Sequence, residues 1–137
     1  MTPKFNTRDV NKSLYANYLK RAEECLYAAR DSFEAEKWNA SAINAIHSCI
    51  AACDAMCVYF LGKRHSGDSH NDAIRLLKTI RENDEGINTN ANRASRILGI
   101  KNMAEYEERL IYRSEAEKIL KDCERFVEFA KKRLPSL

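Results

Sequence analysis

Apolar residues recur at steps of three and four along residues 11–35, and this spacing places side chains on one face of an α-helix. The residues on this face are Leu14, Tyr18, Ala22, Cys25, Leu26, Ala29 and Phe33. Residues 36–39 then form a short connection. The pattern therefore predicts a long amphipathic helix that buries one side and follows a polar N-terminal segment.

The segment of residues 39–61 is apolar on almost every side. Its wide apolar face contains Ile43, Ile46, Cys49, Ile50, Cys53, Met56, Cys57 and Phe60, and alanines fill much of the rest. A helix of this kind lies in the middle of a bundle or against a partner subunit. We expect Asn39 or Ser41 to cap its start and Gly62 to end it in the left-handed conformation.

The second half of the chain predicts shorter elements. Asp68 or Ser69 is expected to cap a third helix that runs through Glu82, and residues 83–90 are expected to form a loop. A short fourth helix covers residues 91–98 and stops at Gly99. The pattern of residues 100–112 does not choose between helix and loop.

A final helix is predicted to begin at residues 114–117, which form a capping-box pattern, and to end at Leu134. The 137 residues include only 4 Gly and 2 Pro, and a chain with so few turn formers is built from a few long helices. The predicted fold class is all-α, an antiparallel up-and-down bundle of four long helices plus a short helix. We expect a flexible N-terminus over residues 1–11 and a single domain over residues 12–134.

Composition narrows the class of protein. Hydrophobic residues make up 45% of the chain and charged residues 31%, as in soluble globular domains. The net charge of +3 is too small to indicate nucleic-acid binding by itself. The longest unbroken apolar run, residues 55–61, is far shorter than the roughly 20 residues that span a bilayer. We expect a cytoplasmic protein without a secretory signal or a membrane contact.

Five cysteines are present, and three of them, Cys49, Cys53 and Cys57, follow one stripe of the second predicted helix. Three thiols spread over about 12 Å of one helix are too far apart for a single metal ion. We expect reduced thiols that pack in the core, the alternative being a metal or redox role. The sequence also contains no phosphate-binding glycine loop or zinc-protease motif, so no cofactor or metal site is predicted.

Candidate chemistry is concentrated at the junction after the second helix, where Arg64, His65 and His70 follow one another closely. A neutral histidine can take a proton from an RNA 2′-hydroxyl, and an arginine can stabilise negative charge on the phosphoryl oxygens. The alternative is an ordinary solvated loop in which His70 stands near a helix start. The residues alone do not separate these interpretations.

Several segments together resemble the HEPN domain superfamily of all-helical prokaryotic proteins. The alanine-rich second helix carries most of the resemblance, and weaker matches follow it; these segments are residues 41–55, 61–64, 67–70, 73–77, 104–107 and 124–127. The similarity covers about residues 12–134. It implies an association with toxin–antitoxin or defence systems, in which a small nucleotidyltransferase-like antitoxin is a possible partner.

The resemblance also implies two possible functions. Many members carry Arg, a polar residue and then His within a few positions, and act as metal-independent endoribonucleases; here Arg64, His65 and His70 match. Members usually dimerise, and many others bind RNA, a nucleotide or a protein without catalysis. We favour a non-catalytic binding module for RNA or a nucleotide, acting as a homodimer, with the endoribonuclease that uses Arg64 and His70 as the alternative.

Overall fold

The computed structural model describes residues 6–67 and 69–137, and most of these residues lie in α-helices, which confirms the all-α class. Two strands accompany six helices in the described part of the chain. The elements, in order, are β1 (Thr7–Asp9), a 3-10 turn (Lys12–Leu14), α1 (Tyr15–Glu34), α2 (Trp38–Leu61), β2 (Lys63–His65), α3 (Asn71–Lys78), α4 (Glu85–Gly99), α5 (Lys101–Tyr106) and α6 (Arg113–Arg133).

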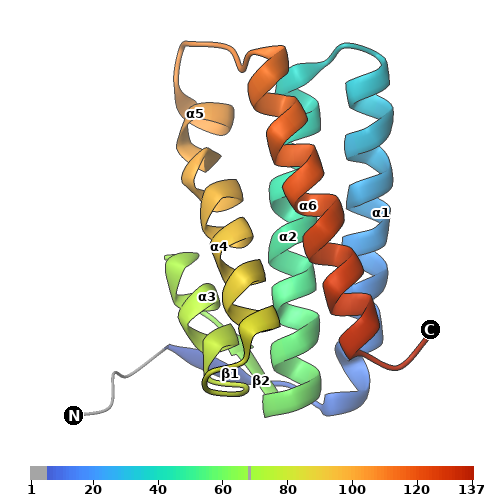
Figure 1. The fold of residues 1–137 in the computed structure, drawn as a ribbon, viewed down its shortest axis with the longest axis vertical. Helices are drawn as coiled ribbons and strands as arrows, with labels where there is room; N and C mark the ends of the chain where they lie inside the picture. The colour runs from blue at the N-terminus through green and yellow to red at the C-terminus, as the bar shows by residue number, and fades with distance from the viewer. Residues whose placement is uncertain (1–5, 68) are drawn as a thin grey trace.

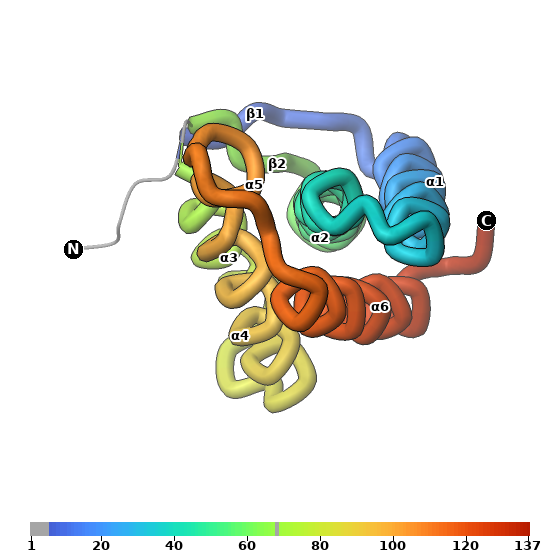
Figure 2. Tube along the Cα trace, turned by 90° about the horizontal axis from the view of Figure 1, so that it is seen from above, coloured from blue at the N-terminus to red at the C-terminus, as the bar shows by residue number. Residues whose placement is uncertain are grey.

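The helices run along one common axis. α1 and α4 run in one direction, whereas α2 and α6 run in the other (Figure 1). Seen along this axis, α2 lies at the centre, with the β1–β2 ribbon on one side and α6 on the opposite side (Figure 2). α1 lies beside α2 and α6 (Figure 2). The predicted central position of the second helix is therefore correct.

The burial of α2 accounts for its composition. Residues 51–58 are all buried, and Ile46, Cys49 and Met56 have no exposed surface. By length and mean hydropathy, α2 is the one helix among the described residues that could cross a membrane, but 67% of its most apolar stretch is buried inside the protein. A core helix passes the same test, so this feature is weak evidence for a membrane segment.

The N-terminal segment differs from its predicted state. Residues 7–9, expected within a flexible terminus, form β1, which pairs antiparallel with β2. Three residues are too few for a strand pattern to show in a sequence, and the pairing depends on β2, more than fifty residues away. The partners in the ribbon are Thr7 with His65, Arg8 with Arg64, and Asp9 with Lys63.

The boundaries of α3 and α4 also require correction. α3 ends at Lys78, before the predicted Glu82, and residues 85–90 of the predicted loop belong to α4. Asp84 caps α4 by accepting a hydrogen bond of 3.0 Å from the Ile87 amide. Gly86 allows α6 to pack closely there, because a Cβ at this position would lie 2.7 Å from the Arg133 guanidinium.

The helix caps were predicted correctly only in part. Gly62 ends α2 at φ 69°, as predicted, but α2 begins after Lys37, so Asn39 and Ser41 lie within the helix. The Ser41 hydroxyl donates to the Ala29 carbonyl, which ties α2 to α1. The Asn39 carboxamide accepts a hydrogen bond from the Ile111 amide and donates one to the Ala104 carbonyl. Residues 100–112 are thereby held as the short helix α5 followed by an extended connection.

Two further caps were placed at the wrong residues. α3 is preceded by His70 as its N-cap residue, not by Ser69, and Asp68 lies outside the described residues. α6 begins one residue before the predicted Ser114, and the Tyr112 amide donates a hydrogen bond of 2.8 Å to Glu115. Gly99, predicted to stop the helix after Leu98, is itself the last residue of α4 and has no left-handed conformation.

Candidate functional site

Arg64 lies in the middle of β2 and is held there by the ribbon and by its own side chain. Its Nη1 atom donates a hydrogen bond of 3.2 Å to the backbone carbonyl of His65. The side chain lines a surface pocket of about 320 Å³ between α1, α2 and β2. The other residues that line this pocket are Tyr18, Arg21 and Cys25 from α1 and His47, Ile50, Ala51 and Asp54 from α2.

His65 points the opposite way, as strand alternation requires, and is only 4% exposed. Its Nδ1 atom lies 3.7 Å from Oδ1 of Asp54, which is also buried. His65 and Asp54 thus form a polar contact between β2 and the central helix. In this position the His65 ring contacts protein groups and does not face solvent.

His70 follows the ribbon and is partly buried. Its ring packs edge-on against the His65 ring, with centroids 5.5 Å apart. Burial lowers the pKa of His70, and nearby His65 and Lys101 lower it further, whereas Asp54 and Glu105 act in the opposite direction. The imidazole is therefore mostly neutral at pH 7, the form that can accept a proton.

The fold places the three predicted site residues near one another, but Arg64 and His70 do not line one common site. His65 contacts both of the others, through its carbonyl to Arg64 and through its ring to His70. Among the described residues, no hydrogen bond or ion pair joins Arg64 to His70, and His70 is not one of the residues that line the Arg64 pocket.

Sequence reasoning did not find the residues that complete the pocket. Tyr18 and Arg21 are three apart on α1, and the Arg21 guanidinium lies 5.5 Å from the centre of the Tyr18 ring. His47 and Asp54 are two turns apart on α2 and are its only charged or histidine side chains. Two titratable side chains seven residues apart, on a helix whose other polar residues are only asparagines and serines, are the signal that could have identified them.

A second small polar cluster lies near the pocket, on α5. The Lys101 ammonium lies 3.0 Å from one Glu105 oxygen, and Nε2 of the exposed His47 lies 3.9 Å from the other. This cluster connects α5 to α2 beside His47.

The cysteines are free thiols. Cys49, Cys53, Cys57 and Cys123 are buried, in agreement with the prediction of core packing, and Cys25 is half-buried. Burial raises the pKa of the Cys57 and Cys123 thiols, the latter to about 12. In the part of the chain that the structure describes, no group of three or more His, Cys, Asp or Glu side chains is placed to hold a metal ion.

Comparison with known families adds one finding to this geometry. The family model for the HEPN domain matches residues 15–134, from the start of α1 to the end of α6. The chain belongs to the HEPN domain family. Among proteins of curated function, none matches it. The HEPN match includes Arg64, His65 and His70, whereas β1 lies outside it and still pairs with β2 inside.

Proposed function

We propose that this HEPN domain is a non-catalytic module that binds RNA or a nucleotide at the pocket around Arg64. HEPN domains are often linked to ribonuclease or toxin–antitoxin roles, so we expect a ligand that contains phosphate. The observation that carries the proposal is that Arg64 and Arg21, from different elements, line one pocket without His70. A phosphate bound there meets two guanidinium groups but not the predicted general base.

The pocket combines the groups that nucleotide recognition needs. Guanidinium groups bind phosphate oxygens through two parallel N–H donors, and they also stack on planar rings. The Arg21 guanidinium, which lies over the Tyr18 ring, offers a planar surface on which a base can stack. The volume of about 320 Å³ is within the range of small-ligand sites.

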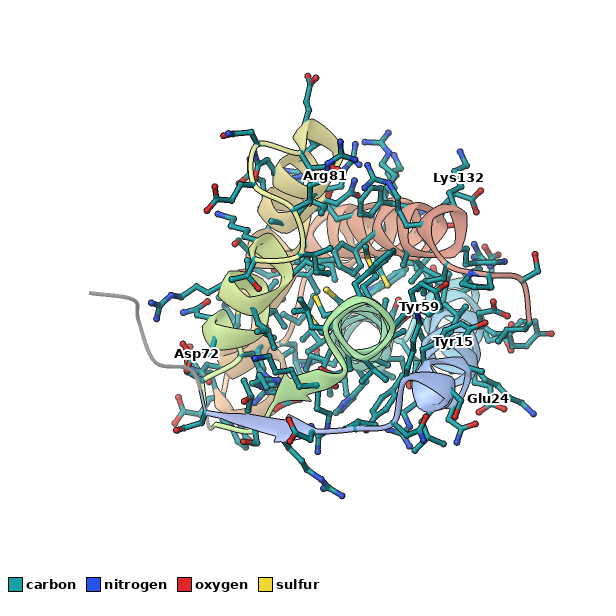
Figure 3. The ribbon with its side chains drawn as sticks, turned by 90° about the horizontal axis from the view of Figure 1, so that it is seen from below. Tyr15, Glu24, Tyr59, Asp72, Arg81 and Lys132 are labelled. Atoms are coloured by element: carbon teal, nitrogen blue, oxygen red, sulfur yellow. The ribbon has the colours of Figure 1, made fainter. Side chains whose placement is uncertain are left out.

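Binding is tested by the fluorescence anisotropy of a labelled oligouridine, with competition by unlabelled nucleotides. Arg64→Ala and Arg21→Ala are each expected to weaken binding at least about tenfold, since each removes a charged phosphate contact. The matched control is Arg81→Ala, which removes the same charge from an exposed arginine at the edge opposite the β1–β2 ribbon (Figure 3). Equal affinities for all three variants and the unaltered protein would reject this pocket.

The second candidate is a metal-independent endoribonuclease, favoured by the partly buried, mostly neutral His70. His70 would take the proton of an RNA 2′-hydroxyl, whose oxygen would attack the adjacent phosphorus. Arg64 would stabilise the phosphoryl charge while the 5′-oxygen of the next nucleotide departs and takes a proton from water, and His70 would then release its proton to solvent. The products would be a 2′,3′-cyclic phosphate and a 5′-hydroxyl, and DNA would not react because it lacks the 2′-hydroxyl.

We also propose that the protein acts in the cytoplasm as a homodimer, in a toxin–antitoxin or defence system with a nucleotidyltransferase-like antitoxin. Most of the apolar surface of α2 is covered within one chain, with Phe60 as a 42% exposed exception, so this helix no longer argues for a dimer. Exposed Tyr106, Leu110 and Tyr112 instead offer apolar surface for a protein contact. Light scattering tests this proposal: a homodimer should have twice the mass of one chain at micromolar concentration.

A further inference from the structure

A second surface with binding character lies between α4 and α6. It contains two adjoining cavities of about 460 and 610 Å³ that share Arg125. We call these two cavities together the α4–α6 groove. Figure 2 shows the central helix α2 between α6 and the β1–β2 ribbon, so the groove and the Arg64 pocket lie on different sides of the molecule.

The first cavity has an apolar floor and a basic rim. Gly99, Ile100 and Ile119 provide the apolar part. The charged side chains that line it are Arg96, Lys118, Lys121, Arg125, Glu115 and Asp122. An apolar floor with a basic rim favours an occupant that brings apolar side chains flanked by negative charge.

The acidic side chains of this cavity are already paired. Asp122 accepts two hydrogen bonds of 3.0 Å from Arg96, and Glu115 binds Arg109 at 2.9 Å. Lys118 and Arg125 form no ion pair with any described residue. The unneutralised charge of the cavity is therefore positive.

The second cavity extends the surface along α6. Phe129 provides an apolar contact there and Arg93 adds positive charge, whereas Lys132 lies 4.0 Å from a Glu128 oxygen. Lys132 projects outward from the end of α6 (Figure 3). From Glu115 to Lys132 the groove follows α6 for roughly 25 Å at 1.5 Å per residue. This length suits a segment of chain better than a single small molecule.

We propose that the α4–α6 groove binds an acidic, amphipathic helical segment of a partner protein. Such a segment places apolar side chains at helical spacing on the floor and carboxylates against the basic rim. Seven basic and four acidic side chains line the two cavities. The interspersed carboxylates disfavour a nucleic acid, whose charge is uniformly negative, whereas a peptide can vary its charge from residue to residue.

Gly99 offers a way to block the groove without disturbing the fold. A Cβ added there would meet no atom within 4 Å, and Gly99 does not have a positive φ. Leucine at this position therefore has room and is also a better helix former than glycine. Gly99→Leu adds volume at the wall of the first cavity, so it is expected to reduce binding while preserving thermal stability.

The test selects binders from a displayed library of random helical peptides against the intact protein. Selected peptides are expected to carry Leu, Ile, Phe or Trp at i, i+3 and i+4 with Asp or Glu around them. A synthetic peptide of the selected sequence should bind at least about tenfold more weakly to Gly99→Leu and to Arg125→Glu. The control Arg8→Glu, an equal change of charge at an exposed position of the β1–β2 ribbon on the other side of the molecule, should stay within about twofold.

Several outcomes would overturn the proposal. The selected sequences could lack acidic amphipathic peptides, or both groove variants could leave peptide affinity unchanged. Oligouridine could displace the peptide, or the protein could form a dimer that Gly99→Leu dissociates. The last two would assign the groove to nucleic acid or to a second copy. Arg64→Ala should leave peptide affinity unchanged, so this test and that of the Arg64 pocket can fail separately.

Discussion

The His70 ring packs edge-on against the His65 ring, with the two centroids 5.5 Å apart and the planes inclined at 61°. His65 is buried against Asp54, whereas His70 is only partly buried at the start of α3. Two histidines that look equivalent in the sequence thus occupy different environments. The first supports the fold, and the second remains accessible for chemistry or binding.

We therefore expect His65→Ala to destabilise the protein far more than His70→Ala. Removal of His65 leaves a cavity and a buried Asp54 without its nearest partner, at a cost of about 2–3 kcal/mol. The partly buried His70 should cost about 1 kcal/mol or less. Urea denaturation followed by circular dichroism measures both. Equal losses would contradict the different environments assigned to the two rings.

Met56→Lys tests the central position of α2. Met56 has no exposed surface, and an unpaired charge at that position should reduce the free energy of unfolding by several kcal/mol, about 3–5. The milder change Cys53→Ser, at a site 1% exposed, should act in the same direction. Lys20→Ala, on the exposed side of α1, is the control and should change little. Equal melting temperatures for Met56→Lys and the unaltered protein would exclude a buried α2.

Acid should weaken the link between α4 and α6. Hydrogen bonds from Arg133 and the Ile87 amide lower the pKa of Asp84 to about 2. A carboxylate with a lowered pKa contributes stability above its unfolded value near 4 and loses it as pH falls toward 2. Asp84→Asn should therefore lower the melting temperature at pH 7 and have less effect at pH 2. Glu82→Gln, which changes an exposed carboxylate in the same loop, is the control and should produce no such difference. An equal pH dependence of the melting temperature for the two variants would contradict the assignment.

Thiol reactivity should follow burial. Burial is the main cause of the raised pKa values of the Cys57 and Cys123 thiols. The pKa of the Cys49 thiol is raised by its hydrogen bond with Cys53 and by burial. Burial also raises the pKa of half-buried Cys25, but this thiol should react first with a thiol reagent at pH 8, because the other four thiols are fully buried and poorly accessible. The number of labelled thiols per chain should reach five after unfolding. Rapid native labelling that persists in Cys25→Ser would contradict this order.

The sequence predicted the elements whose signals are local. The alanine-rich pattern identified α2 as central, and Gly62 correctly marked its end. β1 could not be predicted, because its three residues become a strand only through pairing with β2. The start of α4 was missed because Gly86 suggested a loop, whereas in the structure this glycine makes room for Arg133.

The candidate site was predictable to a similar extent. Arg64 and His70 stood out because they lie close together in a polar junction. Arg21 and Tyr18 did not, because their place in the pocket depends on how α1 packs against α2 and β2. The burial of His65 also depends on that packing, because strand alternation alone does not show which side faces the interior.

The central claim is that Arg64 belongs to a site for binding without cleavage. It is tested most directly by incubating one labelled oligouridine with the protein in EDTA and measuring anisotropy and RNA length in the same samples. The account predicts saturable binding that Arg64→Ala weakens at least about tenfold, His70→Ala leaves within about twofold, and intact RNA throughout. Cleavage to a 2′,3′-cyclic phosphate that both Arg64→Ala and His70→Ala abolish would contradict it and establish the endoribonuclease instead.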